Sequence, residues 1–219
     1  MSQIVLPLKV GANGPSRIVV GNANAGAIEA LAVAASWPFR TAILIGPPRC
    51  GKSLIAQWFV ASGGGEAIDD ADSIDETELF HRWNRAQESG TPLLLIAGSG
   101  AGEWQIKLPD LASRLSAALH LEIGAPDDEM LAELILLHAE QRGLALGPDA
   151  AAYLVPRCER SHVGVERLIA VIDRISLERK APPTQGVWRD ALDEVLGPKE
   201  PRLLCGPVSG TMVDRCYKN

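Results

Sequence analysis

The stretch that determines the fold is Gly46-Pro47-Pro48-Arg49-Cys50-Gly51-Lys52-Ser53, which follows an apolar run at residues 41–45 and precedes a helical pattern at residues 54–61. Its spacing, Gly-x-x-x-x-Gly-Lys-Ser, is that of the phosphate-binding P-loop. In such a loop the glycines let successive backbone N–H groups point at a phosphate, and the following helix adds the positive end of its dipole. The motif and its strand–loop–helix context predict binding of a nucleoside phosphate.

Two side chains of this loop carry the chemistry. Lys52 supplies a full positive charge to the β- and γ-phosphate oxygens, and the Ser53 hydroxyl is a ligand for Mg²⁺. We therefore predict a cofactor site made of the loop and the residue after it: Gly46, Pro47, Pro48, Arg49, Cys50, Gly51, Lys52, Ser53 and Leu54.

An acidic pair is the candidate partner of the P-loop. Asp69 and Asp70 follow a short strand pattern at residues 66–68. Asp69 would belong to the Mg²⁺ shell, and Asp70 would polarise the attacking water. The alternative is a solvated turn that leads into a helix. Ser99, after the strand pattern at residues 92–97, is a candidate contact to the γ-phosphate, with a plain loop serine as its alternative.

Strand and helix patterns alternate in the first part of the chain and only helical patterns follow. Continuous apolar runs predict buried strands at 41–45, 66–68, 92–97 and 120–123. The sequence Ser73-x-x-Glu76 predicts a capping box for the helix that Gly90 ends. After residue 126 the helical patterns cover 127–143, 148–158, 161–180 and 184–196. This order predicts an α/β domain with a parallel sheet and a helical lid.

Four segments are expected from this order. Residues 1–15 form an extended apolar, proline-containing peptide and a Gly/Pro-rich linker, with an N-terminal edge strand as the alternative. Residues 16–124 form the α/β nucleotide-binding domain, and residues 125–196 form the lid. Residues 197–219 carry no periodicity and are expected to be a tail.

Composition places the chain among soluble globular proteins of the cytoplasm. It has 219 residues, of which 47% are hydrophobic and 22% charged, and a net charge of −6. This acidic balance argues against non-specific DNA binding, which needs many Lys and Arg contacts to phosphates. No apolar run approaches the roughly 18 residues that span a bilayer. The four cysteines are too far apart to predict a zinc site or a disulfide framework.

One arginine and four histidines need an interpretation. Arg114 lies in the helical segment 109–119, and periodicity predicts that it projects away from Leu111 and Leu115 into solvent. The alternative is that Arg114 is an ordinary surface arginine without a function. The histidines show no metal-ligand spacing, and we expect all four to be structural: His81, His120, His138 and His162.

Several segments together resemble the initiator-type AAA+ family, and within it the Hda-type regulators related to the replication initiator DnaA. Gly46–Ser53 is similar to its Walker A loop, and Asp69-Asp70 to its Walker B pair. The stretch at 108–115, Leu-Pro-Asp-Leu-Ala-Ser-Arg-Leu, resembles the arginine-finger box of the Hda-type proteins. The resemblance implies a three-layer P-loop AAA+ sheet, a small all-α lid, bound ADP or ATP with Mg²⁺, and catalytic roles for Arg114 and Asp70.

Three further segments carry the resemblance. Residues 18–24 look like the family's segment beside the adenine, which adds Val19, Val20 and Asn24 to the predicted cofactor contacts. Residues 158–161 and the helix after them look like the lid segment with the sensor 2 arginine, for which Arg167 is the candidate because Gly164 occupies another aligned position. Residues 3–8 resemble the peptide that docks on the DNA polymerase sliding clamp, which makes these residues candidate partner contacts: Gln3, Ile4, Leu6, Pro7 and Leu8.

The resemblance implies a clamp-associated regulator that stimulates hydrolysis of DnaA-bound ATP and restrains re-initiation. It would act on its partner's nucleotide more than as a fast ATPase itself, with no membrane contact and no sequence-specific DNA binding, and self-association stays open. Two alternatives remain, an AAA+ motor or helicase loader and a nucleotide-gated adaptor on the clamp. The chain also departs from the family: residues 53–68 between Lys52 and Asp69 leave room for one strand fewer.

Overall fold

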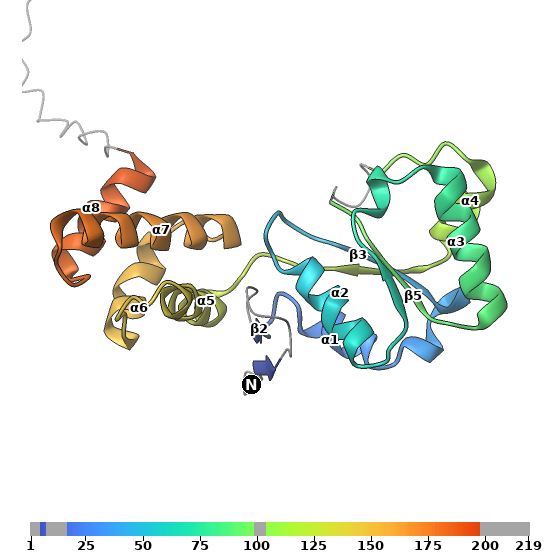
Figure 1. The fold of residues 1–219 in the computed structure, drawn as a ribbon, viewed down its shortest axis with the longest axis horizontal. Helices are drawn as coiled ribbons and strands as arrows, with labels where there is room; N and C mark the ends of the chain where they lie inside the picture. Colours follow the sequence, from blue (N-terminus) through green and yellow to red (C-terminus); the bar gives the residue numbers. More distant parts are fainter. Residues whose placement is uncertain (1–4, 8–16, 99–103, 198–219) are drawn as a thin grey trace, which may run out of the picture.

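The structure is a computed structural model that describes residues 5–7, 17–98 and 104–197 (Figure 1). A sheet with helices on both faces forms one part, and a group of helices forms the other. The elements are, in chain order, β1 (Val5–Pro7), β2 (Arg17–Val19), α1 (Ala25–Leu31), η1 (Ala34–Ser36), η2 (Pro38–Arg40), β3 (Thr41–Ile45), α2 (Lys52–Ala61), β4 (Glu66–Ile68), η3 (Ala71–Ser73), α3 (Glu76–Ser89), β5 (Leu93–Ile96), α4 (Pro109–Ser116), β6 (Leu119–Glu122), α5 (Asp128–Gln141), α6 (Pro148–Leu154), η4 (Val155–Arg157), α7 (His162–Arg179) and α8 (Gln185–Leu196).

The main sheet is parallel and has the strand order β4-β5-β3-β6. Its central strand β3 pairs Thr41 with Leu93 of β5 and Ala42 with Leu119 of β6. The predicted strands all occur, and β3 and β4 have the predicted bounds. Residues 62–65 connect α2 to β4 directly, so the part of the chain that the structure describes contributes four strands to this sheet.

The two faces of β3 bury alternate residues under different helices. Ala42 and Leu44 belong to the cluster under α1 and α2. Ile43 and Ile45 belong to the cluster under α3 and α4. This alternation is the period-2 geometry of a strand that is covered on both faces. It confirms the predicted three-layer α/β architecture and fixes the P-loop at the carboxyl end of a fully buried strand.

The start of α3 differs from the predicted capping box. Asp75 caps the helix, because its carboxylate accepts hydrogen bonds from Thr77 N at 3.0 Å and Glu78 N at 3.1 Å. The Glu76 carboxylate instead accepts the backbone N–H groups of residues 107 and 108 at 2.6–3.0 Å. Because the capping acid lies two positions after Ser73, Glu76 is free to hold the loop that leads into α4.

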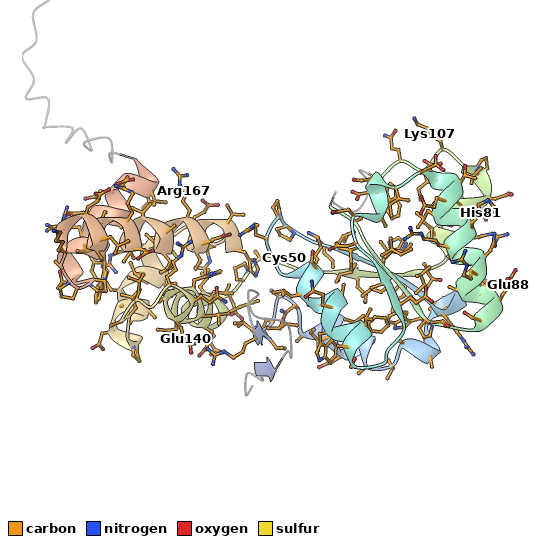
Figure 2. The ribbon with its side chains drawn as sticks, viewed as in Figure 1. Cys50, His81, Glu88, Lys107, Glu140 and Arg167 are labelled. Atoms are coloured by element: carbon orange, nitrogen blue, oxygen red, sulfur yellow. The ribbon has the colours of Figure 1, made fainter. Side chains whose placement is uncertain are left out.

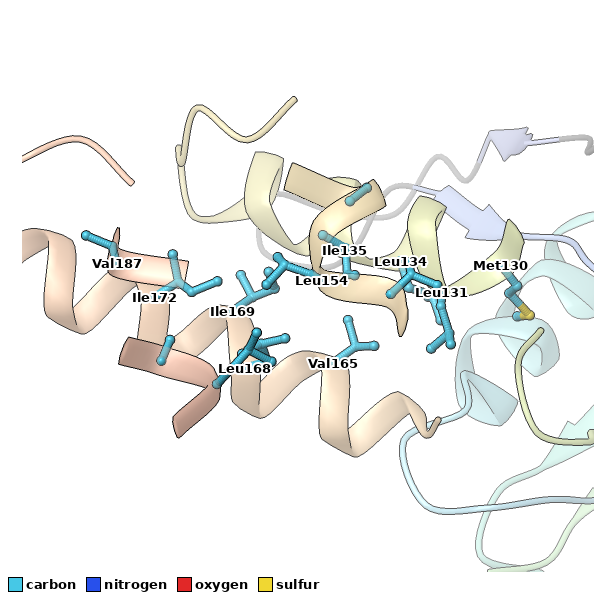
Figure 3. Close-up of a cluster of buried hydrophobic side chains, with 14 of the residues drawn as sticks. Met130, Leu131, Leu134, Ile135, Leu154, Val165, Leu168, Ile169, Ile172 and Val187 are labelled. Carbon is cyan, nitrogen blue, oxygen red and sulfur yellow. The ribbon is translucent and has the colours of Figure 1, made fainter. Parts of the chain in front are cut away.

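The helices α5 to α8 form their own apolar core (Figure 3). Leu131 and Ile135 of α5 face Leu168 and Ile169 of α7, and all four side chains are almost fully buried. Val19 of β2 joins this core, so the lid packs on the strand that also borders the sheet domain. Among the described residues, no helix is long and apolar enough to cross a membrane.

The N-terminal segment pairs with β2. β1 runs antiparallel to β2, with Val5 opposite Val19 and Leu6 opposite Ile18. This backbone pairing is what the edge-strand alternative predicted for the segment. Gln3, Ile4 and Leu8 lie outside the described residues, and binding of residues 3–8 to a clamp stays a prediction.

Candidate functional site

The P-loop connects β3 to α2 and has the tight geometry that its glycines permit. A Cβ atom at Gly46 would lie 2.9 Å from Ile123 Cβ and 3.1 Å from the Ile123 carbonyl oxygen, so the strand end has no room for a side chain. Gly51 has φ of +91°, in the left-handed region that favours glycine. Both glycines are therefore required by the backbone path that turns the loop into α2.

The Lys52 side chain forms hydrogen bonds within the P-loop. Its ammonium group donates to the carbonyl oxygens of Gly46 at 2.8 Å and Pro47 at 3.1 Å. Pro47 and Pro48 are exposed on the outer side of the loop, whereas Cys50 is buried. Burial raises the pKa of the Cys50 thiol, which keeps it neutral beside the lysine. The loop thus holds one cation on neutral carbonyl groups, and phosphate oxygens are stronger acceptors for that cation.

A cavity of about 350 Å³ lies between the P-loop and the lid. Its walls come from β2, the P-loop and start of α2, α5 and the first turns of α7. The lining residues are Arg17, Ile18, Val19, Asn24, Arg49, Cys50, Gly51, Leu54, Met130, Leu134, Leu137, His138, Gln141, Arg142, His162 and Glu166. Figure 1 shows the N-terminal end of α7 beside the loop that precedes α2. Ile18 and Val19 of β2 and Met130 and Leu134 of α5 give the cavity an apolar wall, whereas the later residues of α5 and the first turns of α7 give it polar and charged groups.

The predicted adenine segment contributes a wall to this cavity, with different roles for its members. Val19 lines the cavity, whereas Val20 packs against the core under α1 and is not among the lining residues. Asn24 is 2% exposed and uses both ends of its amide internally, because Oδ1 accepts from Gly21 N and Nδ2 donates to the Val19 carbonyl, each at 2.9 Å. Asn24 therefore fixes the turn after β2, whereas a cofactor contact by Val20 stays a prediction.

The P-loop and the lid are joined by an ion pair. Arg49 Nε donates to Glu166 Oε2 at 2.7 Å, and Arg49 Nη2 donates to the second oxygen of the same carboxylate. This side-on arrangement uses the planar fork of the guanidinium. The hydrogen bond from Arg49 holds the pKa of the Glu166 carboxyl below its ordinary value. The pair thus joins α7 to the P-loop.

The sensor 2 candidate is not at this cavity. Arg167 is exposed, and its side chain extends from α7 on the side away from α5 (Figure 2). Glu166 and His162 are four residues apart and therefore lie on the same face of α7. Arg167 is rotated by about 100° from Glu166 and lies on another face. Arg167 is not among the residues that line the cavity, and its assignment to the cofactor site stays a prediction.

Two histidines at the cavity were missed by sequence reasoning, which treated every histidine as structural. His138 of α5 and His162 of α7 both line it. Burial lowers the pKa of both imidazoles. The only available signal was the placement of His162 at the start of the lid helix, three residues after Glu159, and that signal is weak without the fold.

The predicted magnesium ligands lie together. Ser53 and Asp69 line one surface hollow of about 400 Å³ beside α2. Two oxygen donors, completed by phosphate oxygens and water, fit the ligand set that Mg²⁺ prefers. Asp70 follows with φ of +48°, is exposed, and donates its backbone N–H to Asp69 Oδ1 at 3.1 Å. Among the described residues, no group of three or more His, Cys, Asp or Glu side chains could hold a metal. Ser99 lies outside the described residues.

Arg114 is held against α3 instead of projecting into solvent. Its guanidinium carbon lies 4.6 Å from the ring centre of Phe80 and 4.5 Å from that of Trp83, and Nη1 donates to Asn84 Oδ1 at 2.6 Å. Residues three apart are neighbours on a helix surface, so Arg114 lies beside Leu111 on the face that packs. This corrects the predicted exposure of Arg114, and its action on a partner stays a prediction.

Comparisons with known proteins give a fold and curated relatives. No family model matches the sequence. An uncharacterised protein of Haemophilus influenzae is 34% identical over 117 residues, which are 51% of this chain and 51% of that protein. The matched region thus spans about half the length of this curated relative.

Solved structures match over most of the chain. Domain III of the Thermotoga maritima replication initiation protein DnaA has a TM-score of 0.66 at 16% identity, covering 82% of this chain and 95% of that one. The Holliday junction branch migration motor RuvB of Thermotoga maritima has a TM-score of 0.58 at 19% identity, covering 81% and 70%. A DnaA structure bound to AMPPCP and single-stranded DNA scores 0.54 at 18% identity, covering 74% and 65%. The chain has a DnaA-like AAA+ fold.

Proposed function

We propose that this chain binds an adenine nucleotide with Mg²⁺ between the P-loop and the lid, and acts from that site as a regulator of the replication initiator DnaA. The observation that supports the proposal is that β2, the P-loop, α5 and α7 all line one cavity. It combines an apolar wall for a base with a P-loop for phosphates, in a chain whose fold is DnaA-like.

Each residue of the loop has a role in this proposal. Lys52 exchanges its carbonyl acceptors for phosphate oxygens, and the P-loop backbone N–H groups point at the same oxygens. Ser53 and Asp69 are the two protein ligands for Mg²⁺, and Asp70 orients water beside them. Met130 and Leu134 of α5, together with Val19, form the apolar surface for the base. Bound nucleotide supplies the contact that ties the sheet domain to the lid.

Action on DnaA is assigned to Arg114. An arginine that a neighbouring subunit inserts beside a γ-phosphate can raise hydrolysis by roughly 10³–10⁵. Phe80 and Trp83 hold the Arg114 guanidinium in place, which reduces the side-chain freedom that it loses on docking. Arg114 would therefore act on ATP held by DnaA and leave the nucleotide of its own chain as a structural cofactor.

Docking on the sliding clamp is assigned to the N-terminal peptide. Clamp grooves that accept an extended apolar segment would take Leu6 and Leu8 as anchors, with Gln3 as the hydrogen-bonding head. Because Leu6 pairs with Ile18 in β2, a clamp that binds the backbone of this peptide competes with β2 for it. The cytoplasm is the compartment in which this function would occur.

The test measures hydrolysis of ATP bound to purified DnaA in the presence of clamp loaded on DNA. Wild-type protein is expected to accelerate it, whereas R114A and a chain without residues 1–8 are not. Clamp binding without acceleration would contradict the proposal and favour a nucleotide-gated adaptor. Rapid ATP hydrolysis by the chain without DnaA would also contradict it and favour a motor or helicase loader.

A further inference from the structure

A buried histidine of the lid has polar atoms that nothing in the described chain satisfies. His162 is 5% exposed, and neither of its ring nitrogens has a hydrogen-bond partner. Buried polar atoms in native proteins are nearly always paired, so an orphaned pair on one ring calls for an explanation. His162 is one of the residues that line the cavity between the P-loop and α7.

The surroundings of His162 indicate which part of a ligand it meets. Burial lowers the pKa of His162 most, and His138 of α5 and the positive charge of Lys52 in the P-loop lower it further. The other charged residues that line the cavity are Arg17 of β2, Arg49 of the loop, Arg142 of α5 and Glu166 of α7. Arg17 is paired with Glu140. Arg49 and Glu166 neutralise each other in an ion pair. Arg142 is paired with Asp173, with 3.6 Å between Nη1 and Oδ2. The orphaned imidazole therefore belongs to the phosphate end of the cavity.

We propose that His162 is the lid's contact to the phosphates of the bound nucleotide, and that its protonation couples nucleotide affinity to pH. This inference rests on the proposed nucleotide site and adds a residue and a regulation to it. A neutral imidazole donates one hydrogen bond, whereas the protonated ring donates two and adds a positive charge. Arg167, the predicted lid cation, points elsewhere, so the lid's phosphate contact falls to a titratable group.

The direction of the pH effect follows from linkage. Burial beside Lys52 favours the neutral ring in the free protein, and a phosphate anion favours the protonated ring. Binding then takes up a proton, so affinity rises as the pH falls between the two pKa values. A single linked proton changes the affinity by at most about tenfold per pH unit.

The experiment measures the dissociation constant of fluorescently labelled ADP with Mg²⁺ at pH 8 and pH 6, for wild type, H162Q, H162F and the exposed control H81Q. For each protein, the dissociation constant at pH 8 is divided by that at pH 6. A substitution that weakens ADP binding equally at both pH values therefore leaves this ratio unchanged. Protonation of the nucleotide itself contributes equally to every protein. The ratio of wild type and of H81Q is expected to exceed that of H162Q and H162F by about tenfold.

A second readout follows the ring itself. Imidazole ¹⁵N shifts, assigned by the loss of one histidine signal in H162Q, should change from the neutral toward the protonated pattern when ADP is added to wild type at pH 7. Equal pH ratios in wild type and both His162 variants, or a ring that stays neutral with ADP, would overturn the inference. Absence of ADP binding by wild type at every pH would instead overturn the proposed nucleotide site.

Discussion

Arg49 in the P-loop and Glu166 in the lid helix α7 form a two-point ion pair, with Arg49 Nε 2.7 Å from Glu166 Oε2. The two residues are 117 positions apart in the chain, and each lies on an element that lines the nucleotide cavity. Movement of the lid away from the loop has to break this contact. The pair therefore connects the P-loop directly to the lid helix.

A double-mutant cycle of R49A and E166Q should give a small but measurable coupling. The side chains are 65% and 28% exposed, so we expect a coupling free energy of roughly 0.5–1 kcal/mol in urea unfolding at low salt. Because Arg49 lowers the pKa of Glu166, the coupling is present at neutral pH and is lost as the pH falls through that lowered pKa. Strict additivity of the two variants at low salt and neutral pH would show that the pair does not hold the lid.

Arg114 gives a prediction in which stability and activity separate. The contacts with Phe80, Trp83 and Asn84 predict that R114A loses about 1–2 kcal/mol of unfolding free energy, since cation–π contacts contribute roughly 0.5–2 kcal/mol each. R114K should recover part of this stability, because an ammonium also binds a ring face. It should not recover stimulation of DnaA, because a point charge lacks the planar fork. Urea unfolding and the hydrolysis assay on the same preparations check both, and stimulation by R114A equal to wild type would refute the role in trans.

The stability of the nucleotide-free protein should fall in mild acid. Burial lowers the pKa of His138 and of His162, so the unfolded chain binds protons that the folded chain does not. The unfolding free energy is then highest above the ordinary histidine pKa of about 6.5 and falls as the pH drops through it. Urea unfolding between pH 8 and pH 5.5 measures this slope. H162Q should flatten it relative to wild type, and an unchanged slope would show that His162 does not titrate on unfolding.

A side chain should be rejected at Gly46 of the P-loop and accepted at Gly26 of helix α1. G46A places a methyl group 2.9 Å from Ile123 Cβ, so we expect a loss of roughly 1–3 kcal/mol in stability together with weakened ADP binding. G26A is the matched control, because its added Cβ meets nothing within 4 Å in helix α1. Alanine there should stabilise the protein by roughly 0.5–1 kcal/mol. Equal melting temperatures for the two variants would contradict the close approach at Gly46.

Local sequence signals were sufficient for the architecture because they are repeated along each element. Alternating burial of Ala42, Ile43, Leu44 and Ile45 needs helices on both faces, and the continuous apolar run predicted that coverage. The P-loop spacing predicted the strand–loop–helix unit in the same way. The cap of α3 could not be separated by pattern alone, because Ser73 and Asp75 are both good N-cap residues and only the path of the loop selects Asp75.

Side chains that meet across distant elements were not predictable from one sequence. Arg114 depends on two aromatic rings of α3, and Arg49 on a carboxylate of α7. The spacing of His162 in the sequence does not mark it as a metal ligand or a binding residue. It becomes a candidate only because its ring is buried and unpaired in the wall of a cavity. Adjacent residues of α7 also differ in what they contact, since Glu166 binds Arg49 of the loop and Arg167 is exposed.

Equilibrium binding of ADP with Mg²⁺ to wild type, K52A and the exposed control K107A tests the central claim most directly. Loss of the charge-assisted contact of Lys52 should lower the binding free energy by about 1.5–3 kcal/mol. In calorimetry this is a dissociation constant roughly 10- to 100-fold larger. K107A should bind as wild type does. Failure of wild type to bind ADP, or equal affinity of wild type and K52A, would contradict the claim that this loop holds a nucleotide.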